Sequence, residues 1–426
     1  MAAVVSVLVY RDERLFMEDV ALADIVSMIG SPCYVYSRRA LTDAYRAFRE
    51  ALDAQRSLVC YAVKANGNIA LLATLADLGA GFDIVSRGEL ERVLAAGGDP
   101  ARVVFSGVGK TEGEIRRALE LGIRCFNVES VAELARLDTV AGELGVRAPV
   151  SLRVNPDVDA GTHHYIATGL KENKFGIPLA EAVACYREGS RYPHVSFVGI
   201  DCHIGSQLTD LRPFGDALDR VLPEVAGLRR AGVALSHVDV GGGLGVRYRD
   251  ERPPTIAAYV ALVRERLAAH GLQDLELILE PGRALVAAAG VLATRVEYIK
   301  ETDVKRFAIV DAGMNDLIRP ALYGAWQSVT AARRRPGPVR EYDVVGPVCE
   351  SADVFGRGRP LVIEPGDILA IGEAGAYGFA MSSQYNARPR PAEVLVDGAR
   401  FHVVRRRETY EDLMRGECVV PAGSRP

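Results

Sequence analysis

The sequence lacks the features that mark several large classes of protein. Its 426 residues carry a formal net charge of -4, so there is no basic excess of the kind that binds nucleic acid. No apolar run is long enough to cross a membrane. The apolar start, Met1 to Tyr10, is short and has no basic leader, so we expect a strand there rather than a signal peptide.

Paired cysteines are also absent. The seven cysteines stand at positions 33, 60, 125, 185, 202, 349 and 418, and no two of them form a Cys-x-x-Cys pair, so we expect no zinc site and no other metal. Most of them lie in apolar runs and are predicted to be inert core residues. The odd count without a leader predicts a reducing, cytoplasmic location.

What the chain does contain is a globular composition and a regular rhythm. It is 49% hydrophobic and 25% charged, which suits a soluble protein with two sizeable cores. Over about 230 residues, apolar β-branched runs alternate with amphipathic stretches, which predicts a parallel (β/α)8 barrel. The predicted strands are Leu58–Val63, Gly81–Val85, Val103–Phe105, Arg124–Val128, Val150–Val154, Phe197–Cys202, Ser236–Val240 and Leu275–Leu279.

From about residue 290 the rhythm changes to short strands separated by turn signals, which predicts an all-β domain, a sandwich or a barrel. Its predicted strands are Val291–Tyr298, Arg306–Val310, Tyr342–Val345, Ile368–Ile371, Glu393–Val396 and Arg400–Val404. We expect an N-terminal segment at 1–30 whose strand, near Ser6 to Tyr10, joins this domain, a cofactor-binding barrel at 31–288 and the β domain at 289–426. The basic loop Ala331 to Arg340 is interpreted as solvated.

The end of the first predicted barrel strand carries a lysine. In Tyr61-Ala62-Val63-Lys64, a buried apolar run meets an ammonium group, whose burial is costly unless it is paired or made neutral. Lys64 is either a surface lysine in water or an amine nucleophile, most often one that forms a Schiff base with pyridoxal phosphate (PLP). One lysine does not decide between these readings.

Other predicted strand ends carry groups suited to a cofactor site, and the active sites of barrels collect at this end. Gly241-Gly242-Gly243 follows the seventh predicted strand, where barrels often bind phosphate, although a tight turn is an equal alternative and the dinucleotide fingerprint is not met. Glu280, before Pro281-Gly282-Arg283, could hold a pyridine nitrogen protonated or could be solvated. His203 could stack on a ring or be a satisfied core histidine.

Taken together, these motifs resemble those of the alanine-racemase-type (fold type III) PLP enzymes. The motifs that carry this resemblance are Tyr61–Asn66, His203–Gln207, Gly241–Gly243 and Glu280–Arg283. More narrowly, four further motifs resemble those of the decarboxylases of this group that act on diaminopimelate: Gly169–Gly176, Arg319–Ala325, Cys349–Asp353 and Gly375–Gly378. The resemblance covers essentially the whole chain.

The resemblance implies PLP-dependent decarboxylation of meso-2,6-diaminopimelate to L-lysine and carbon dioxide, the last step of lysine synthesis. It implies that Lys64 is the Schiff-base lysine and that Cys349, contributed by the second subunit of a homodimer, is the proton donor. The further residues implied to bind the cofactor are Asp83, His203, Ser206, Gly243, Glu280, Gly282, Arg283 and Tyr377. Those implied to bind the substrate are Arg283, Arg319, Tyr323, Glu350 and Tyr377.

The chemistry of this reaction agrees with the implied roles. Two arginines that form bidentate pairs suit the carboxylate that the substrate retains. A thiol such as that of Cys349 is a workable acid near neutral pH for the carbon that loses carbon dioxide. Its place before Glu350 in a polar loop argues against a buried apolar role.

Three alternatives from other classes remain. A racemase of the same group places an arginine at the pyridine nitrogen, and Glu280 argues against it. Decarboxylases of ornithine, arginine or lysine share the carboxylate and the cysteine but leave no carboxylate on their product, so Arg319 would lack a purpose. A non-enzymatic PLP carrier of this group is a lone barrel, whereas this chain also predicts a β domain.

Overall fold

The structure is a computed structural model that describes residues 7–53, 55–158 and 173–420. Its contacts divide the chain into two units. The β unit comprises Met1–Ser37, Gly290–Ala374 and Met381–Pro426, and the barrel unit comprises Arg38–Ala289 and Gly375–Ala380. The sequence prediction placed the first division after residue 30. The difference is strand β4 (Cys33–Ser37), which pairs within the sheet of the β unit.

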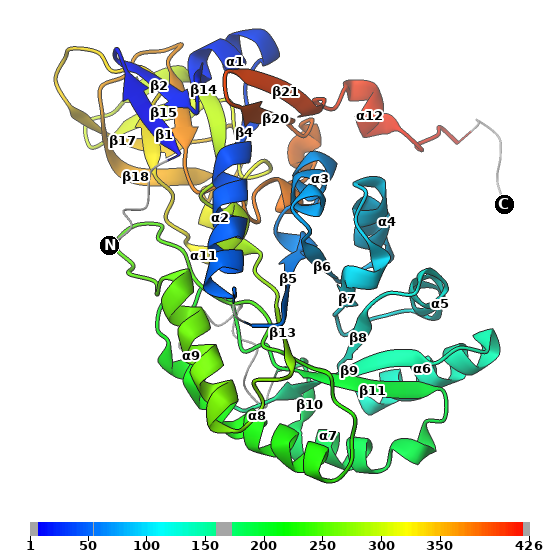
Figure 1. Cartoon of the computed structure of the whole chain (residues 1–426). Coiled ribbons are helices and arrows are strands. Elements are labelled where there is room, and N and C mark those ends of the chain that lie inside the picture. The colour runs from blue at the N-terminus through cyan, green and yellow to red at the C-terminus, as the bar shows by residue number, and fades with distance from the viewer. Residues whose placement is uncertain (1–6, 54, 159–172, 421–426) are drawn as a thin grey trace. The chain divides into compact units, whose positions relative to one another are not determined.

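Eight parallel strands form the barrel unit (Figure 1). They are β5 (Ser57–Ala62), β6 (Gly81–Ile84), β7 (Val103–Phe105), β8 (Cys125–Val128), β9 (Ala148–Asn155), β11 (Val195–Asp201), β12 (His237–Asp239) and β13 (Glu276–Leu279). Each pairs with the next, and β13 pairs back with β5, so the sheet closes. The predicted (β/α)8 barrel is confirmed. The short β10 (Ile177–Pro178) adds to the edge of β9.

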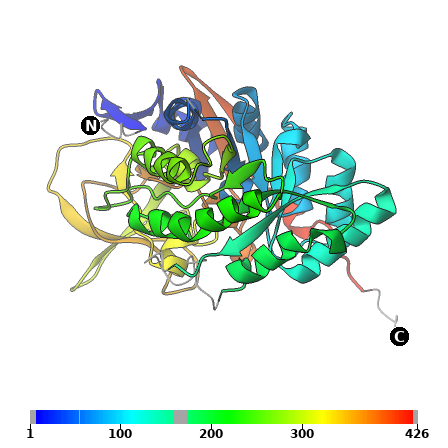
Figure 2. The same cartoon turned by 60° about the horizontal axis from the view of Figure 1, so that its bottom comes forward.

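Helices follow the strands and surround the barrel, as the two ribbon views show (Figures 1 and 2). They are α2 (Arg38–Ala51), α3 (Ile69–Asp77), α4 (Arg87–Ala95), α5 (Glu112–Leu121), α6 (Val131–Leu144), α7 (Leu179–Arg187), α8 (Arg212–Arg230), α9 (Ile256–Ala269) and α10 (Arg283–Val286). Side-chain oxygens cap several of them, for example Thr111 at α5 and Ser130 at α6. In the described part of the chain no helix is long and apolar enough to cross a membrane.

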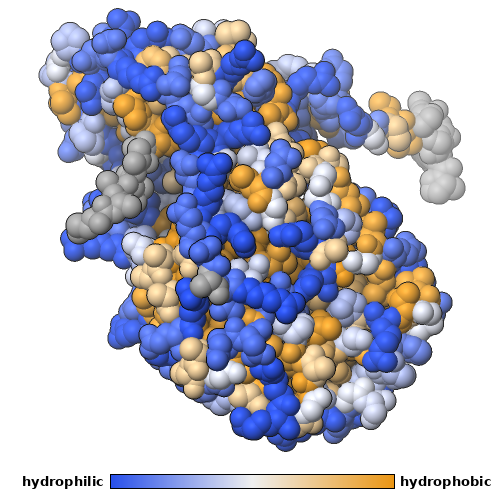
Figure 3. All heavy atoms as spheres, viewed as in Figure 1, coloured by the Kyte–Doolittle hydropathy of each residue, from blue (hydrophilic) through white to orange (hydrophobic). Residues whose placement is uncertain are grey.

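Helix α2 illustrates how the sequence sets the outer layer. Its buried side chains, Leu41, Tyr45 and Phe48, recur at helical spacing and face the barrel unit, where α2 lies against α9 and α10. The opposite face carries charged residues such as Arg46 and Glu50 and forms a hydrophilic strip on the surface (Figure 3). One face therefore packs and the other stays in water.

The β unit is built on one large sheet. Its order is β18-β17-β15-β14-β4-β20-β21, and β19 pairs with both β14 and β16. The bounds are β14 (Gly290–Glu301), β15 (Arg306–Val310), β16 (Val329–Ala331), β17 (Arg340–Val345), β18 (Val354–Leu361), β19 (Ile368–Ile371), β20 (Ala392–Asp397) and β21 (Arg400–Arg405). The helices here are α1 (Leu22–Ile29), α11 (Arg319–Tyr323) and α12 (Tyr410–Met414).

The N-terminal strands form a small sheet of their own within the β unit. Strands β1 (Leu8–Arg11), β2 (Arg14–Met17) and β3 (Val20–Ala21) pair in that order. Leu15 and Met17 of β2 are buried in one apolar cluster with Val35 and Val291 of the large sheet. The N-terminal segment thus packs on the large sheet through β2, while β4 is the early strand that enters it.

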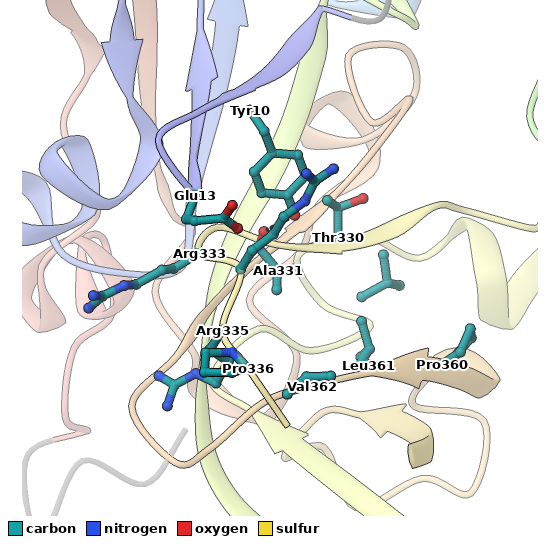
Figure 4. Close-up of a pocket in the computed structure, with 12 residues that line it drawn as sticks. Tyr10, Glu13, Thr330, Ala331, Arg333, Arg335, Pro336, Pro360, Leu361 and Val362 are labelled. Carbon is teal, nitrogen blue, oxygen red and sulfur yellow. Dashed lines mark hydrogen bonds between the residues drawn. The ribbon is translucent and has the colours of Figure 1, made fainter. Parts of the chain in front are cut away.

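A hollow of about 660 Å³ lies in the β unit beside the loop that was interpreted as solvated (Figure 4). Tyr10, Arg333, Arg334 and Arg335 are among its lining residues. The guanidinium carbon of Arg334 lies 3.9 Å from the centre of the Tyr10 ring, and Arg335 forms ion pairs of 2.5 Å with Glu364 and with Asp367. Two of the three arginines are therefore already engaged by the protein's own groups.

Candidate active site

Lys64 lies just beyond the strand that was predicted to end with it. Strand β5 ends at Ala62, and Lys64 is the middle residue of a single 3-10 turn, Val63–Ala65. The turn packs closely against the loop after β13, because a Cβ on Gly282 would lie 3.1 Å from the Cβ atoms of both Ala62 and Ala65. The predicted strand, Leu58–Val63, differs from β5 by one residue at each end, and Val63 belongs to the turn.

The amine of Lys64 is held by a buried carboxylate. Its Nζ lies 2.5 Å from Oδ2 of Asp83, which is buried in β6, while the Lys64 side chain keeps 37% of its exposure. Burial by itself lowers the pKa of Lys64, but Asp83, Glu280 and Tyr377 outweigh it and raise this pKa above its ordinary value. Oδ1 of Asp83 is buried and has no hydrogen-bond partner among the described residues.

The three glycines after β12 use their amides in different ways. Gly241 N–H donates to Asp239 Oδ1 at 2.9 Å, and Gly242 N–H donates to His203 Nδ1 at 3.1 Å. The N–H of Gly243 has no partner in the described part of the chain. A Cβ on Gly243 would lie 2.6 Å from the Gly205 carbonyl oxygen, so its backbone passes directly beside the residue that precedes Ser206. Of the three amides, that of Gly243 is the one left for an anion.

Arg283 brings the predicted phosphate-binding side chains together. Its Nη2 donates to Ser206 Oγ at 3.2 Å, and its Nη1 donates to the Tyr248 hydroxyl at 2.6 Å. Its guanidinium carbon lies 4.8 Å from the centre of the Tyr377 ring. Tyr377 is anchored in turn by a hydrogen bond of 2.7 Å from its N–H to the Ala65 carbonyl, next to Lys64. The structure therefore gathers Arg283, Ser206 and Tyr377 at the strand ends of the barrel.

Glu280 belongs to a buried cluster of carboxyl groups. Its Oε1 accepts a hydrogen bond of 3.1 Å from the Asn127 side chain, and carboxyl oxygens of Asp201, Asp239 and Glu280 all lie within 4.8 Å of one another. Burial, followed by Asp239, Asp83 and Asp201, raises the pKa of Glu280 well above its ordinary value. Burial likewise raises the pKa of Asp239 to about 6. The cluster therefore holds protons at pH values where exposed carboxyl groups have lost them.

His203 follows β11 and is half-buried. Arg153, at the end of β9, donates from Nη2 to the His203 carbonyl at 3.4 Å and from Nη1 to Glu129 at 3.0 Å. Burial, then Arg153 and Lys64, lower the pKa of His203 well below its ordinary value. The imidazole is therefore neutral at physiological pH.

The remaining predicted site residues belong to the β unit. Arg319 is buried on α11, and its guanidinium carbon lies 5.4 Å from the centre of the Tyr323 ring. Cys349 is exposed. Oε1 of Glu350 accepts a hydrogen bond of 2.7 Å from the Tyr385 hydroxyl. Gly169 to Glu172 of the predicted motif lie outside the described residues.

Several residues that form hydrogen bonds or ion pairs within the site were not predicted from the sequence. They are Asn127, Glu129, Arg153, Asp201, Asp239 and Tyr248. Asn127 and Arg153 lie in the predicted strands Arg124–Val128 and Val150–Val154, without a predicted function. Asp201 and Asp239 were missed, although an aspartate between apolar residues at the end of a buried strand is itself a signal, because burying a carboxylate needs a reason.

The residues present fit PLP. A lysine amine stands beside a buried carboxylate, one oxygen of which has no hydrogen-bond partner among the described residues, and both lie at the same barrel end as Glu280. The amide of Gly243, the Ser206 hydroxyl and the Arg283 guanidinium are the donor types that a phosphate needs. A carboxylate, an amine and a set of donors suited to a phosphate thus occur at one end of the barrel.

Comparison with known proteins agrees with this fit. The family described as pyridoxal-dependent decarboxylase, pyridoxal binding domain, matches residues 38–287. The chain is 61% identical over 412 residues to a diaminopimelate decarboxylase of Pseudomonas aeruginosa, which covers 97% of this chain and 99% of the relative. It is 58% identical over 411 residues to a diaminopimelate decarboxylase of Vibrio cholerae, with 96% and 98% covered.

Solved structures that are similar to this chain are also diaminopimelate decarboxylases. The diaminopimelate decarboxylase of M. jannaschii in co-complex with L-lysine has a TM-score of 0.93 at 39% identity, covering 97% of this chain and 98% of that chain. The enzyme of Helicobacter pylori complexed with L-lysine has a TM-score of 0.89 at 44% identity, covering 92% and 98%. The chain therefore belongs to the diaminopimelate decarboxylase family, whose members are PLP-dependent decarboxylases.

Proposed function

We propose that this protein converts meso-2,6-diaminopimelate to L-lysine and carbon dioxide, in the cytoplasm and as a homodimer with shared active sites. The observation that carries the proposal is the Lys64–Asp83 pair on the same barrel end as the buried Glu280. The likeness to lysine-bound relatives supports lysine as the product. Bound PLP supplies an electron sink for the bond to the departing carboxyl group.

The barrel residues hold the cofactor. Lys64 provides the amine for covalent attachment, and Asp83 balances its positive charge. Glu280 presents a carboxylate to the pyridine nitrogen and keeps it protonated. His203 packs on the ring face and Tyr377 touches cofactor and substrate. Phosphate is bound by Ser206, Gly243, the amide of Gly282 and Arg283.

The β unit provides the residues that select the substrate. Arg319, together with Arg283, binds the carboxylate that is retained, because a planar guanidinium matches a carboxylate with two hydrogen bonds. Tyr323 supports Arg319 through its ring, and Glu350 binds the distal ammonium group. Cys349 of the partner subunit gives a proton to the carbon that has lost carbon dioxide.

The test is release of carbon dioxide from diaminopimelate, lysine, ornithine and arginine, compared side by side with the purified protein. We expect release from diaminopimelate and at least a hundredfold less from the other three, because they leave the arginines for the retained carboxylate unpaired. If carbon dioxide is released from ornithine, arginine or lysine as fast as from diaminopimelate or faster, that amino acid and not diaminopimelate is the substrate.

A further inference from the structure

The position of His203 depends on the glycine loop after β12. Gly242 N–H donates to Nδ1 of His203 at 3.1 Å, so this ring nitrogen is the acceptor. The ring packs directly on Gly241, where a Cβ would lie 2.6 Å from Nδ1. The Gly242 backbone lies close to the loop after β13, because a Cβ there would collide with the Glu280 carbonyl oxygen, and Glu280 N–H donates to the Gly241 carbonyl at 2.8 Å. The loop therefore holds the donor and the ring in one arrangement.

A ring nitrogen that accepts a hydrogen bond carries no proton. In a neutral imidazole the proton is then on the other nitrogen, and in an imidazolium both nitrogens are donors. Protonation of Nδ1 would place two hydrogens against each other between His203 and Gly242. We propose that the Gly242 amide is a positioning group that keeps His203 as the neutral Nε2–H tautomer, so that His203 transfers no proton in the reaction.

The charges around the ring act in opposite directions. Arg153 on β9 and Lys64 after β5 oppose a positive imidazole. Carboxylates would favour one, but burial raises the pKa values of Asp201, Asp239 and Glu280, at the ends of β11, β12 and β13, and so weakens their negative charge. Oδ2 of Asp201 lies 3.8 Å from Nε of Arg153, so the positive charge of the guanidinium partly balances any negative charge on Asp201. Burial is the largest cause that lowers the pKa of His203, the two cations lower it further, and the ring stays neutral.

This inference rests on the proposed function and deepens it. A neutral ring adds no positive charge beside a cofactor whose ring nitrogen is protonated, whereas an imidazolium would repel it. It also places the single ring proton of His203 on Nε2. The acid for the substrate carbon must then come from another residue, which agrees with the role proposed for Cys349.

The direct experiment uses 15N-histidine-labelled holoenzyme. The ring nitrogens of His203 are assigned as the signals lost in His203→Gln, with free imidazole in the sample as the titrating reference. From pH 5.5 to 9 we expect Nδ1 unprotonated, Nε2 protonated and no change in either, while the reference titrates. A proton on Nδ1, or titration of His203 in this range, would overturn the proposal. Neither result depends on turnover, so the carbon dioxide assay tests the proposed function separately.

A pair of variants tests the hydrogen bond itself. Asparagine at 203 places its amide oxygen near the position of Nδ1 and can still accept from Gly242, whereas glutamine extends its amide toward the position of Nε2. Loss of the acceptor leaves the part-buried N–H of Gly242 without its partner in His203. We expect PLP, measured by equilibrium binding, to bind about tenfold more weakly to His203→Gln than to His203→Asn. Equal affinities would show that Gly242 does not position this residue.

Discussion

Asn127 Nδ2 lies 3.1 Å from Oε1 of Glu280 and 3.4 Å from Oδ2 of Asp239, so one amide group from β8 serves two carboxyl groups on the opposite side of the barrel. Both carboxyl groups are buried and both have raised pKa values. Because a neutral amide cannot balance two negative charges, the pair keeps a proton at a pH where exposed carboxylates are ionised.

The first prediction concerns stability and pH. The pKa of Asp239 is about 6 in the folded protein against an ordinary value of 3.8. The folded state therefore binds this proton more tightly, and stability falls as pH rises from about 4 to 6, by at most about 3 kcal/mol. Asp239→Asn should remove this loss and make the cofactor-free protein more stable at pH 8. Denaturant unfolding at pH 5 and pH 8 measures it, with Asp303→Asn in an exposed turn as control. An unchanged pH dependence would contradict the prediction.

The second prediction concerns Glu280. Glu280→Gln keeps the size and the hydrogen bond with Asn127 but cannot balance a protonated pyridine nitrogen. We expect kcat to fall by about 10²–10³, the range for removing one preorganised electrostatic group, while PLP remains bound. Steady-state kinetics and the cofactor absorbance spectrum check both parts. A variant with near-normal kcat would show that Glu280 does not face the nitrogen.

The third prediction is that Lys64 carries the cofactor. Borohydride should fix PLP to the peptide that contains Lys64, and Lys64→Ala should not be labelled. Asp83→Asn removes the largest influence that raises the pKa of Lys64, so its amine should become reactive at lower pH. The pH dependence of labelling by cofactor and borohydride measures this shift. Labelling at another lysine would refute the assignment.

The fourth prediction concerns Arg319. Arg319→Lys keeps the positive charge but loses the planar pair of donors and the contact with the Tyr323 ring. We expect kcat/KM for diaminopimelate to fall by at least tenfold, with an unchanged cofactor spectrum. Arg340→Lys, on the exposed start of β17, is a matched control. If Arg319→Ala keeps near-normal kinetics, Arg319 does not bind the substrate.

The barrel could be predicted from the sequence because its strands are apolar runs buried on both faces, and such runs are visible locally. In the β unit, strands β14, β15, β17, β19, β20 and β21 were predicted as well, but β16 and β18 were not. Strand β18 reads Val-Phe-Gly-Arg-Gly-Arg-Pro-Leu, which has weak strand propensity, and it forms by pairing with β17. Strand β4 pairs with β14 and β20, which lie more than two hundred residues later.

The same difference applies to the site. Lys64, His203 and Glu280 stand out because each is a charged or polar group that follows an apolar run. The hydrogen bond from Gly242 to His203 and the cluster around Asp239 arise only when the ends of different strands meet. Their spacing in sequence is set by the helices between the strands and carries no sign of the contact.

The last prediction concerns Cys349 and the second subunit. Cys349 is exposed in the β unit, and its N–H lies 3.4 Å from the Asn386 side-chain oxygen, within a loop that also holds Glu350. If this loop completes the site of the partner, each dimer has two shared sites. Cys349→Ala should then bind PLP normally but fail to protonate the substrate carbon, and Lys64→Ala should fail for lack of the amine. Cys418→Ala, at the other exposed cysteine, should keep full activity.

Mixing the two inactive variants separates a shared site from a site within one chain. When subunits exchange at random, roughly half of the dimers contain one chain of each kind, and each of these has one site with both native residues. Activity should return to about a quarter of that of the unmodified protein. If Cys349 served the barrel of its own chain, every site would carry one defect and the mixture would stay inactive. Exchange is verified with two affinity tags, so an inactive mixture after proven exchange would refute the shared site without affecting the assignment of the reaction.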